Sequence, residues 1–214
     1  HVGGLEEVMM QGRYIARKKP NMVITPEYER ILWKQSLMGG AAHSETGSQL
    51  RFKDFWNIIR PTKKRNYPRE TWEVNVGSIN LKLPRTMHIP DRATSWESSF
   101  WSCGVIVDDR ALFTSDTRFD PDLLLEFDDR FNLDVIFHDC QFFNGGVHAS
   151  LQELTTLPEA IKKKTVLMHY GDNWQQYRQV AKDAGFHSFA EQSTSYNFAP
   201  ASDSVISKIG LAGV

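Results

Sequence analysis

Short apolar segments alternate with helical segments in the second half of the chain, and this pattern limits the possible fold most strongly. Apolar runs of strand length occupy residues 103–107, 111–114, 133–137 and 165–168, and helical spacing occupies residues 121–129, 150–163 and 174–184. Upstream, residues 71–83 alternate apolar and polar side chains around a glycine, which is typical of a hairpin. Strands between helices predict a layered α/β fold, and the hairpins predict a mixed sheet.

The first part of the chain adds fewer elements. Residues 21–25 form a short apolar run suited to a buried strand, and Pro26 lies near the start of a helical stretch over residues 27–37. With 214 residues, 41% of them apolar and 24% charged, the chain has the composition of an ordinary globular protein. Because it contains no linker or repeat, we expect residues 1–214 to form a single domain.

Titratable side chains follow the ends of the predicted strands. These residues are His88, Asp116, Asp139, His148 and His169. A rigid sheet that gathers polar groups at its strand ends is a common way to build a metal or catalytic site. Each residue alone also has an ordinary interpretation, as a turn cap or a surface histidine, so only the combination indicates a site. We expect His43 to lie at the surface or at the rim of a pocket, and His187 to be structural.

Charge and cysteine content exclude several classes of protein. The net charge of −1 argues against a protein that coats nucleic acid or an anionic membrane by charge alone, and the basic run at residues 60–65 is interpreted as a solvated face. Cys103 and Cys140 are too few for a disulfide framework, so we expect reduced thiols and a cytoplasmic location. No apolar run approaches the length of about 20 residues that a membrane span needs, and no membrane partner is predicted.

The order of these residues and their neighbours resembles the metallo-β-lactamase superfamily, and within it the ribonuclease Z-like and cyclic-nucleotide phosphodiesterase-like branch. The matching segments are His1-Val2-Gly3-Gly4-Leu5, His88-Ile89-Pro90, Ser115-Asp116-Thr117, His138-Asp139, Gly146-Val147-His148 and Met168-His169-Tyr170. Four departures are visible: Ser115 replaces a glycine, Asp139 replaces a longer glutamate, one extra residue precedes His148, and Gly171 replaces a serine. The resemblance covers residues 1–7 and 85–175.

The resemblance implies a four-layer αββα sandwich with mixed sheets that lacks its first strands in this chain. It implies that His1, His88, Asp116 and His169 bind two divalent metal ions, Zn or Mn, with Asp116 bridging them. His148 would be the general acid, and Asp139 would orient it. Since His1 matches the last histidine of a longer motif, we expect a preceding segment or a separate chain to complete the site. Without it, the 214 residues are expected to be inactive.

The activity that the resemblance implies is that of a two-metal phosphodiesterase acting on small or cyclic nucleotides. Ribonuclease Z-like members carry a long tRNA-gripping arm between the residues that match His88 and Asp116, and here only a loop and a strand pair fit between them. Alternatives are an endoribonuclease, an ester or lactone hydrolase of the same fold, and a catalytically degenerate binding or structural subunit. A homodimer is expected. The aromatic residues of the loop at 91–101 either stack a base or form a core or dimer contact.

Overall fold

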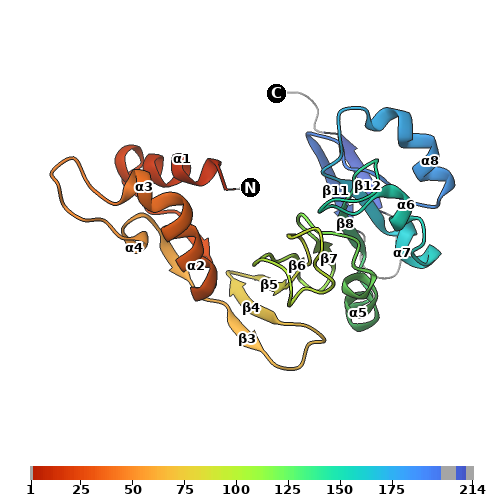
Figure 1. Cartoon of the computed structure of the whole chain (residues 1–214), viewed down its shortest axis with the longest axis horizontal. Helices are drawn as coiled ribbons and strands as arrows, with labels where there is room; N and C mark the ends of the chain where they lie inside the picture. Colours follow the sequence, from red (N-terminus) through yellow and green to blue (C-terminus); the bar gives the residue numbers. More distant parts are fainter. Residues whose placement is uncertain (1, 199–205, 211–214) are drawn as a thin grey trace. The chain divides into compact units, whose positions relative to one another are not determined.

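The structure is a computed structural model that describes residues 2–198 and 206–210 (Figure 1). The chain divides into two compact units, with the boundary between Thr62 and Lys63. Each unit has its own hydrophobic cluster. The prediction of a single domain remains a prediction, because compactness does not show whether either unit folds alone.

The first unit is a small arrangement of short helices around a parallel strand pair. The strands are β1 (Asn21–Val23) and β2 (Asn57–Ile59), and the helices are α1 (Gly4–Met10), α2 (Pro26–Leu32), α3 (Met38–Ala41) and α4 (Phe52–Phe55), with π-helical turns at Gln11–Ile15 and Trp33–Leu37. Helix α2 begins where the sequence predicts, because the Thr25 side chain accepts a hydrogen bond from the Tyr28 N–H and Pro26 occupies the first turn. Met9 and Phe55 are fully buried in this unit.

The second unit is built on one mixed eight-stranded sheet. Its spatial order is β10-β9-β8-β7-β6-β5-β4-β3. The strands are β3 (Thr62–Lys64), β4 (Thr71–Val76), β5 (Ile79–Pro84), β6 (Val105–Val107), β7 (Ala111–Phe113), β8 (Val135–Asp139), β9 (Thr165–Met168) and β10 (Ser188–Phe189). Strands β4 to β7 pair antiparallel, and β7 to β10 pair parallel. The predicted α/β class, the mixed sheet and the hairpin over residues 71–83 are confirmed.

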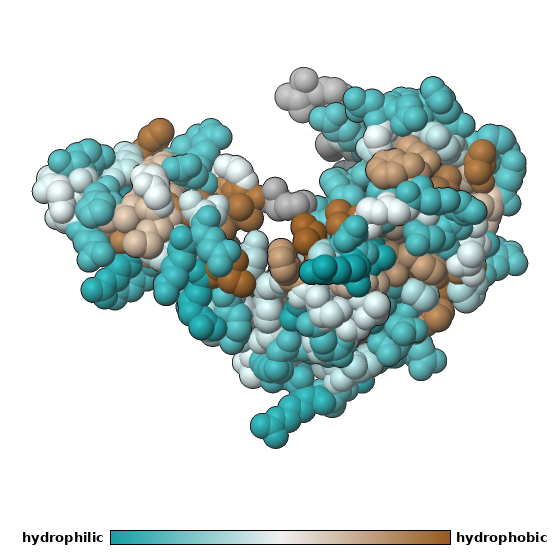
Figure 2. Space-filling view, viewed as in Figure 1, coloured by the Kyte–Doolittle hydropathy of each residue, from teal (hydrophilic) through white to brown (hydrophobic). Residues whose placement is uncertain are grey.

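Side chains of β8 are buried along its whole length, because both faces of the sheet are covered there. On one face, Ile106, Leu112 and Ile136 belong to the main core cluster together with Leu123 and Phe127 of helix α5 (Pro121–Phe131). On the other face lie Val135 and Phe137, and Phe137 contacts Tyr196 of strand β11 (Thr194–Phe198), which pairs with β12 (Ile206–Gly210). On the molecular face that Figure 2 shows, hydrophilic residues are widespread and apolar residues lie among them.

One expectation about this unit is corrected, and one is not tested. The predicted helix over residues 150–163 is two helices, α6 (Leu151–Leu154) and α7 (Glu159–Lys163), because Pro158 lacks an N–H and cannot continue the first helix. The four-layer αββα arrangement, which was expected to lack its first strands in this chain, remains a prediction. The register runs without interruption from β4 to β10, so these strands make a single sheet, accompanied in the described chain by the two-stranded pairs β1–β2 and β11–β12.

Residues 174–184, predicted as one helix, form a 3₁₀ turn at Trp174–Tyr177 that leads into α8 (Arg178–Asp183). Among the described residues, no helix combines the length and the apolar character that crossing a membrane requires.

Candidate functional site

The five strand-end residues of the second unit come together at one edge of the sheet. Asp116 follows β7, Asp139 ends β8, and His169 follows β9. Because these three strands are parallel neighbours, their carboxyl ends meet at the same edge. His88 reaches this edge from the segment after β5, and His148 reaches it from the loop between β8 and α6. We call His88, Asp116, Asp139, His148 and His169 the histidine–aspartate cluster.

Asp139 is the most enclosed member of this cluster, with no exposed side-chain area. Its Oδ2 lies 2.6 Å from His148 Nδ1 and accepts a 2.9 Å hydrogen bond from the Thr117 N–H. Its Oδ1 lies 3.1 Å from His169 Nδ1. A buried carboxylate with this many partners is rigid, and it fixes the rings of both histidines.

Asp116 lies near two of the histidines, and its side chain is more open to solvent than that of Asp139. Its Oδ1 is 3.6 Å from His169 Nδ1, and its Oδ2 is 4.0 Å from His88 Nε2. Each carboxylate oxygen therefore faces a different imidazole, which is the arrangement that a bridging ligand needs. Ser115, directly before it, has a φ of 56°, in the left-handed region that favours glycine. This turn directs the Asp116 side chain into the cluster.

The His148 ring lies close to both of the other imidazoles. The ring centroids of His88 and His148 are 5.1 Å apart, and those of His148 and His169 are 5.0 Å apart. His88 is buried, and its Nδ1 lies 2.9 Å from the Val147 carbonyl oxygen, which orients Nε2 toward Asp116. The His169 side chain is half exposed, which makes it the imidazole of the three that is most open to solvent. Its backbone has a φ of 55°.

The donor atoms of the cluster are of the kinds that zinc or manganese accepts. One nitrogen or oxygen from each of Asp139, His148 and His169 lies within 4.8 Å of the others, a spacing that can hold a metal ion. The sequence placed the metal on His88, Asp116 and His169 and gave His148 and Asp139 a catalytic role. The structure brings both groups to one place, and the assignment of roles between them remains a prediction. His1, the remaining predicted ligand, lies outside the described residues.

Two backbone groups that hold the cluster in place could not be predicted from the sequence. They are the Thr117 N–H on Asp139 and the Val147 carbonyl on His88. No side-chain pattern signals such contacts, because any residue type could supply them. His138, next to Asp139, is fully buried and turned toward the core, and burial lowers the pKa of its imidazole, so it packs as a neutral residue. His43 is exposed as predicted.

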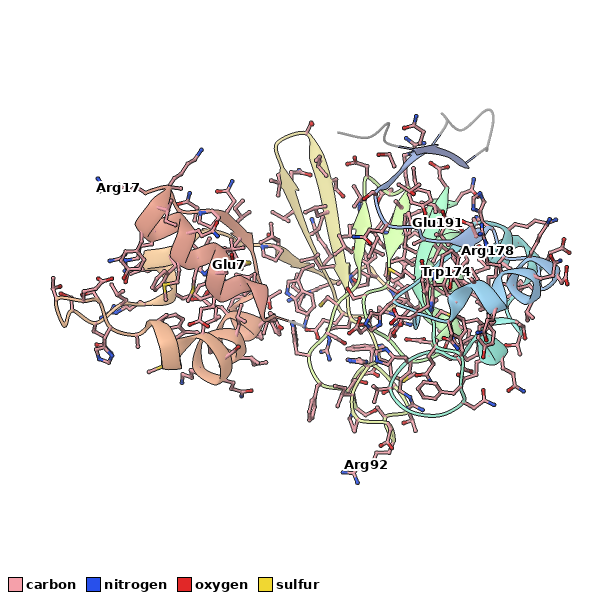
Figure 3. All side chains as sticks on the ribbon, turned by 90° about the horizontal axis from the view of Figure 1, so that it is seen from above. Glu7, Arg17, Arg92, Trp174, Arg178 and Glu191 are labelled. Atoms are coloured by element: carbon pink, nitrogen blue, oxygen red, sulfur yellow. The ribbon has the colours of Figure 1, made fainter. Side chains whose placement is uncertain are left out.

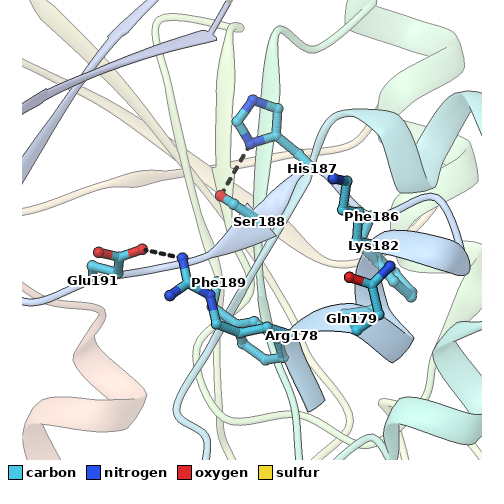
Figure 4. Close-up of a pocket in the computed structure, with 9 residues that line it drawn as sticks. Arg178, Gln179, Lys182, Phe186, His187, Ser188, Phe189 and Glu191 are labelled. Carbon is cyan, nitrogen blue, oxygen red and sulfur yellow. Dashed lines mark hydrogen bonds and ion pairs between the residues drawn. The ribbon is translucent and has the colours of Figure 1, made fainter. Parts of the chain in front are cut away.

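A separate pocket of about 310 Å³ lies between α8 and β10 (Figure 4). Its lining includes His187, whose Nδ1 lies 3.0 Å from Ser188 Oγ, and Arg178, which pairs with Glu191 at 3.6 Å. The guanidinium of Arg178 also lies 5.2 Å from the centre of the Trp174 ring, and Figure 3 shows these side chains on the same side of the second unit. None of the cluster residues lines this pocket.

The family model described as "Anti-Pycsar protein Apyc1" matches residues 1–196. The chain is 38% identical to the Anti-Pycsar protein Apyc1 of Paenibacillus harenae, over 83% of this chain and 67% of that protein. It is 34% identical to the protein of the same name from Bacillus phage BSP38, over 83% of this chain and 66% of the relative. A third relative, from Bacillus phage 010DV004, is 32% identical over 92% of this chain and 73% of its own length. The chain therefore spans about two thirds of the length of these relatives.

These matches correct two expectations. The assignment to the ribonuclease Z-like branch of the metallo-β-lactamase superfamily is wrong. The function drawn from it was a two-metal phosphodiesterase acting on small or cyclic nucleotides, with an endoribonuclease, an ester or lactone hydrolase or a degenerate subunit as alternatives, and it is replaced by the description of the family as Anti-Pycsar proteins. The motifs behind it are short, and each fixes little more than one histidine or aspartate at a strand end, which unrelated families can share. The family model and these relatives agree on one description, and the chain belongs to the Anti-Pycsar protein Apyc1 family.

Proposed function

We propose that this chain acts on a cyclic nucleotide and degrades it, as part of a protein that counteracts Pycsar. The link to Pycsar is supported by the family, because its members are named Anti-Pycsar proteins. The contact that supports the chemistry is the 2.6 Å approach of His148 Nδ1 to Asp139 Oδ2 at the edge where Asp116 and His169 also lie. An imidazole held this way by a buried carboxylate can transfer a proton through its other nitrogen.

The residues of the cluster also fit a divalent metal ion. Two carboxylates and three imidazoles converge here, and Asp116 turns one oxygen to His169 and the other toward His88. We propose that His88, Asp116 and His169 hold the metal, with two ions, Zn or Mn, as the full complement. Asp139 is the weaker candidate ligand, because His148, His169 and the Thr117 N–H already occupy its oxygens. A bound ion would lower the pKa of a water molecule and offset the charge of the phosphate.

The residues then have separate tasks in opening the cyclic phosphate. A water molecule attacks phosphorus through its oxygen and releases one proton to solvent, the bond from phosphorus to one ribose oxygen breaks, and that oxygen takes a proton from His148. His148 supplies the proton from Nε2, because its Nδ1 is turned to Asp139. Asp139 is a positioning residue: its buried carboxylate keeps the His148 ring in one orientation. The product is a linear nucleoside monophosphate. A homodimer and a cytoplasmic location remain part of the proposal.

The test uses the full-length protein and 3′,5′-cyclic nucleotides with each of the four ribonucleoside bases, with chromatography of the products. We expect conversion to linear monophosphates by the wild type and by His43→Ala, which removes an exposed histidine outside the cluster. His148→Ala should slow conversion strongly. If the wild type, supplied with Zn²⁺ or Mn²⁺, leaves all the cyclic nucleotides intact, the proposed function is wrong.

A further inference from the structure

The loop between His88 and β6 is held in place by one buried arginine. Arg85, at 6% exposure, lies directly after β5 and points its guanidinium into this loop. Its hydrogen bonds go to the carbonyl oxygens of Trp96 (3.1 Å), Ser99 (3.3 Å), Phe100 (3.3 Å) and Ser102 (3.2 Å), and to the Glu70 carboxylate (3.5 Å). A planar guanidinium that serves several carbonyl groups fixes the loop backbone far better than a flexible ammonium would. The loop is therefore preformed.

The aromatic residues of this loop are not equivalent. Trp101 lies against Trp72 with ring centroids 4.9 Å apart, and the Arg85 guanidinium lies 4.4 Å from the centre of the Trp101 ring. The Trp101 ring is thus packed against Trp72 and Arg85. Phe100, its neighbour in sequence, is 68% exposed, although its backbone is fixed by Arg85. The Phe100 ring is therefore open to contact with a ligand while its backbone is held in place.

Phe100 is also tied to the histidine–aspartate cluster. Its N–H donates a 2.6 Å hydrogen bond to the carbonyl of Ile89, the residue after His88. A second connection comes from the other side: the Arg118 N–H donates to the Met87 carbonyl at 2.7 Å, and the Arg118 guanidinium bonds the Ala93 carbonyl. The loop is thus fixed to the segments that carry both His88 and Asp116. Arg92, which belongs to the same loop, extends away from the body of the second unit (Figure 3).

We propose that Phe100 is the ring on which the base of the cyclic nucleotide stacks, and that Arg85 is the positioning residue that holds it there. The inference rests on the proposed function, because it assumes that the phosphate lies at the cluster. Stacking on an aromatic side chain tolerates any base, since every base has a π face. Phe100 therefore contributes affinity for the nucleoside part without selecting one base, and it takes no part in breaking the bond to phosphorus.

The experiment compares two substrates in the full-length protein. One is a 3′,5′-cyclic nucleotide, and the other is 1-O-methylribose 3′,5′-cyclic phosphate, which keeps the sugar and the phosphate but has no base. For Phe100→Ala we expect KM for the nucleotide to rise about tenfold, kcat to change little, and KM for the base-free substrate to stay the same. Phe100→Trp should restore the nucleotide KM. Leu125→Ala, which truncates a partly exposed side chain on α5, is the matched control.

Arg85→Lys tests the positioning role, because lysine keeps the charge but cannot serve several carbonyl groups at once. We expect the same selective rise in KM, with kcat for the base-free substrate unchanged in a variant that remains folded by thermal melting. Equal effects of Phe100→Ala on both substrates, or no effect on either, would overturn the proposal. So would a change of oligomeric state in Phe100→Ala without a change in KM, which would mean that the ring contacts a second copy of the chain.

Failure of the proposed function gives a different result. In that case the wild type opens neither substrate, and equilibrium binding of the cyclic nucleotide, measured by calorimetry, replaces KM as the readout. Binding that weakens about tenfold in Phe100→Ala but not in Leu125→Ala supports the stacking role in that case as well. Binding that is equal in both variants, or absent from the wild type, contradicts it.

Discussion

His148 Nδ1 lies 2.6 Å from Oδ2 of Asp139, and the Asp139 side chain is completely buried. The same carboxylate contacts His169 through its other oxygen at 3.1 Å. Asp139 therefore organises two imidazoles without facing solvent itself, while Asp116, which is 22% exposed, turns its oxygens to His169 and His88. The two aspartates have different surroundings, and we expect them to have different functions.

The role of His148 as an acid predicts a dependence on the leaving group. Removing a general acid costs about 10²- to 10⁴-fold when the leaving oxygen is a poor one, such as a ribose alkoxide. His148→Ala should therefore lose at least about a hundredfold in kcat on a cyclic nucleotide. It should lose far less on bis-p-nitrophenyl phosphate, whose leaving group needs no proton. Steady-state kinetics on both substrates decide this, and equal losses on the two would rule out the acid role.

Asp139 should act through His148 and not through the metal. Asp139→Asn keeps the shape of the side chain and removes its charge, so we expect kcat on the cyclic nucleotide to fall about as far as in His148→Ala. The double variant should be little worse than either single variant, because both changes remove one function. The bound metal, measured by elemental analysis, should remain. Loss of the metal in Asp139→Asn would instead make Asp139 a ligand.

Asp116 should be needed for metal binding. We expect Asp116→Ala to lower the metal content of the purified full-length protein, because its oxygens face two of the three imidazoles. His43→Ala should keep the wild-type content. Elemental analysis after dialysis, repeated with a chelator, measures the effect. An unchanged content in Asp116→Ala would show that the metal lies elsewhere or is absent.

Stability of the second unit should depend on a buried ion pair whose two residues are not members of the histidine–aspartate cluster. Asp120 accepts a 2.7 Å hydrogen bond from Arg69, which is almost fully buried, and its side chain also accepts from the Leu123 N–H to begin α5. Asp120→Ala removes the shorter ion pair of the buried arginine and leaves the 3.6 Å pair with Glu126, and it should lower the free energy of unfolding by about 3–5 kcal/mol.

The matched variant for this pair is Asp120→Asn, which keeps a side chain able to begin the helix and loses the charge. It should be more stable than Asp120→Ala by about 1 kcal/mol. Urea denaturation of both variants measures the two contributions. A loss below about 1 kcal/mol in Asp120→Ala would show that the pair contributes little to folding.

The Cys103 thiol should be unreactive in the folded protein. Burial raises the pKa of Cys103 to about 12, against the nearby Arg85 charge, which lowers it. Since the thiolate is the reactive form, alkylation by iodoacetamide at about pH 8 should be at least about a hundredfold slower in the native protein than in urea. Peptide mapping follows this residue separately from Cys140. The pKa of the Cys103 thiol is higher in the folded protein than in the unfolded chain. Its contribution to the free energy of unfolding is therefore fully present below the ordinary thiol pKa, and it is lost as the pH rises from there toward 12. Rapid alkylation of the native protein would contradict the burial of this thiol.

The sequence predicted the sheet edge that carries the cluster, because the order of strands and helices predicts parallel neighbours and parallel strands end together. Asp116, Asp139 and His169 could be placed on this ground alone. The contacts that select among them could not be predicted. The Thr117 N–H and the Val147 carbonyl are backbone groups, and their positions depend on the tertiary structure.

Elsewhere, local patterns were weaker guides. The helical spacing of residues 150–163 continues across Pro158, although the backbone cannot follow it. The loop aromatics were equally ambiguous in the sequence. Only the contact between Trp101 and Trp72 separates a packed ring from the exposed ring of Phe100. The family was misjudged because histidines and aspartates at strand ends describe a kind of chemistry and not one lineage.

The central claim is that the histidine–aspartate cluster degrades a cyclic nucleotide. The most direct measurement is phosphorus NMR of a 3′,5′-cyclic nucleotide incubated with the full-length protein in the presence of Zn²⁺ or Mn²⁺. We predict that the cyclic phosphate resonance is replaced by that of a linear monophosphate with the wild type and His43→Ala, and that it persists with Asp116→Ala. A cyclic resonance that persists with the wild type, or disappears equally fast with Asp116→Ala, would contradict the account.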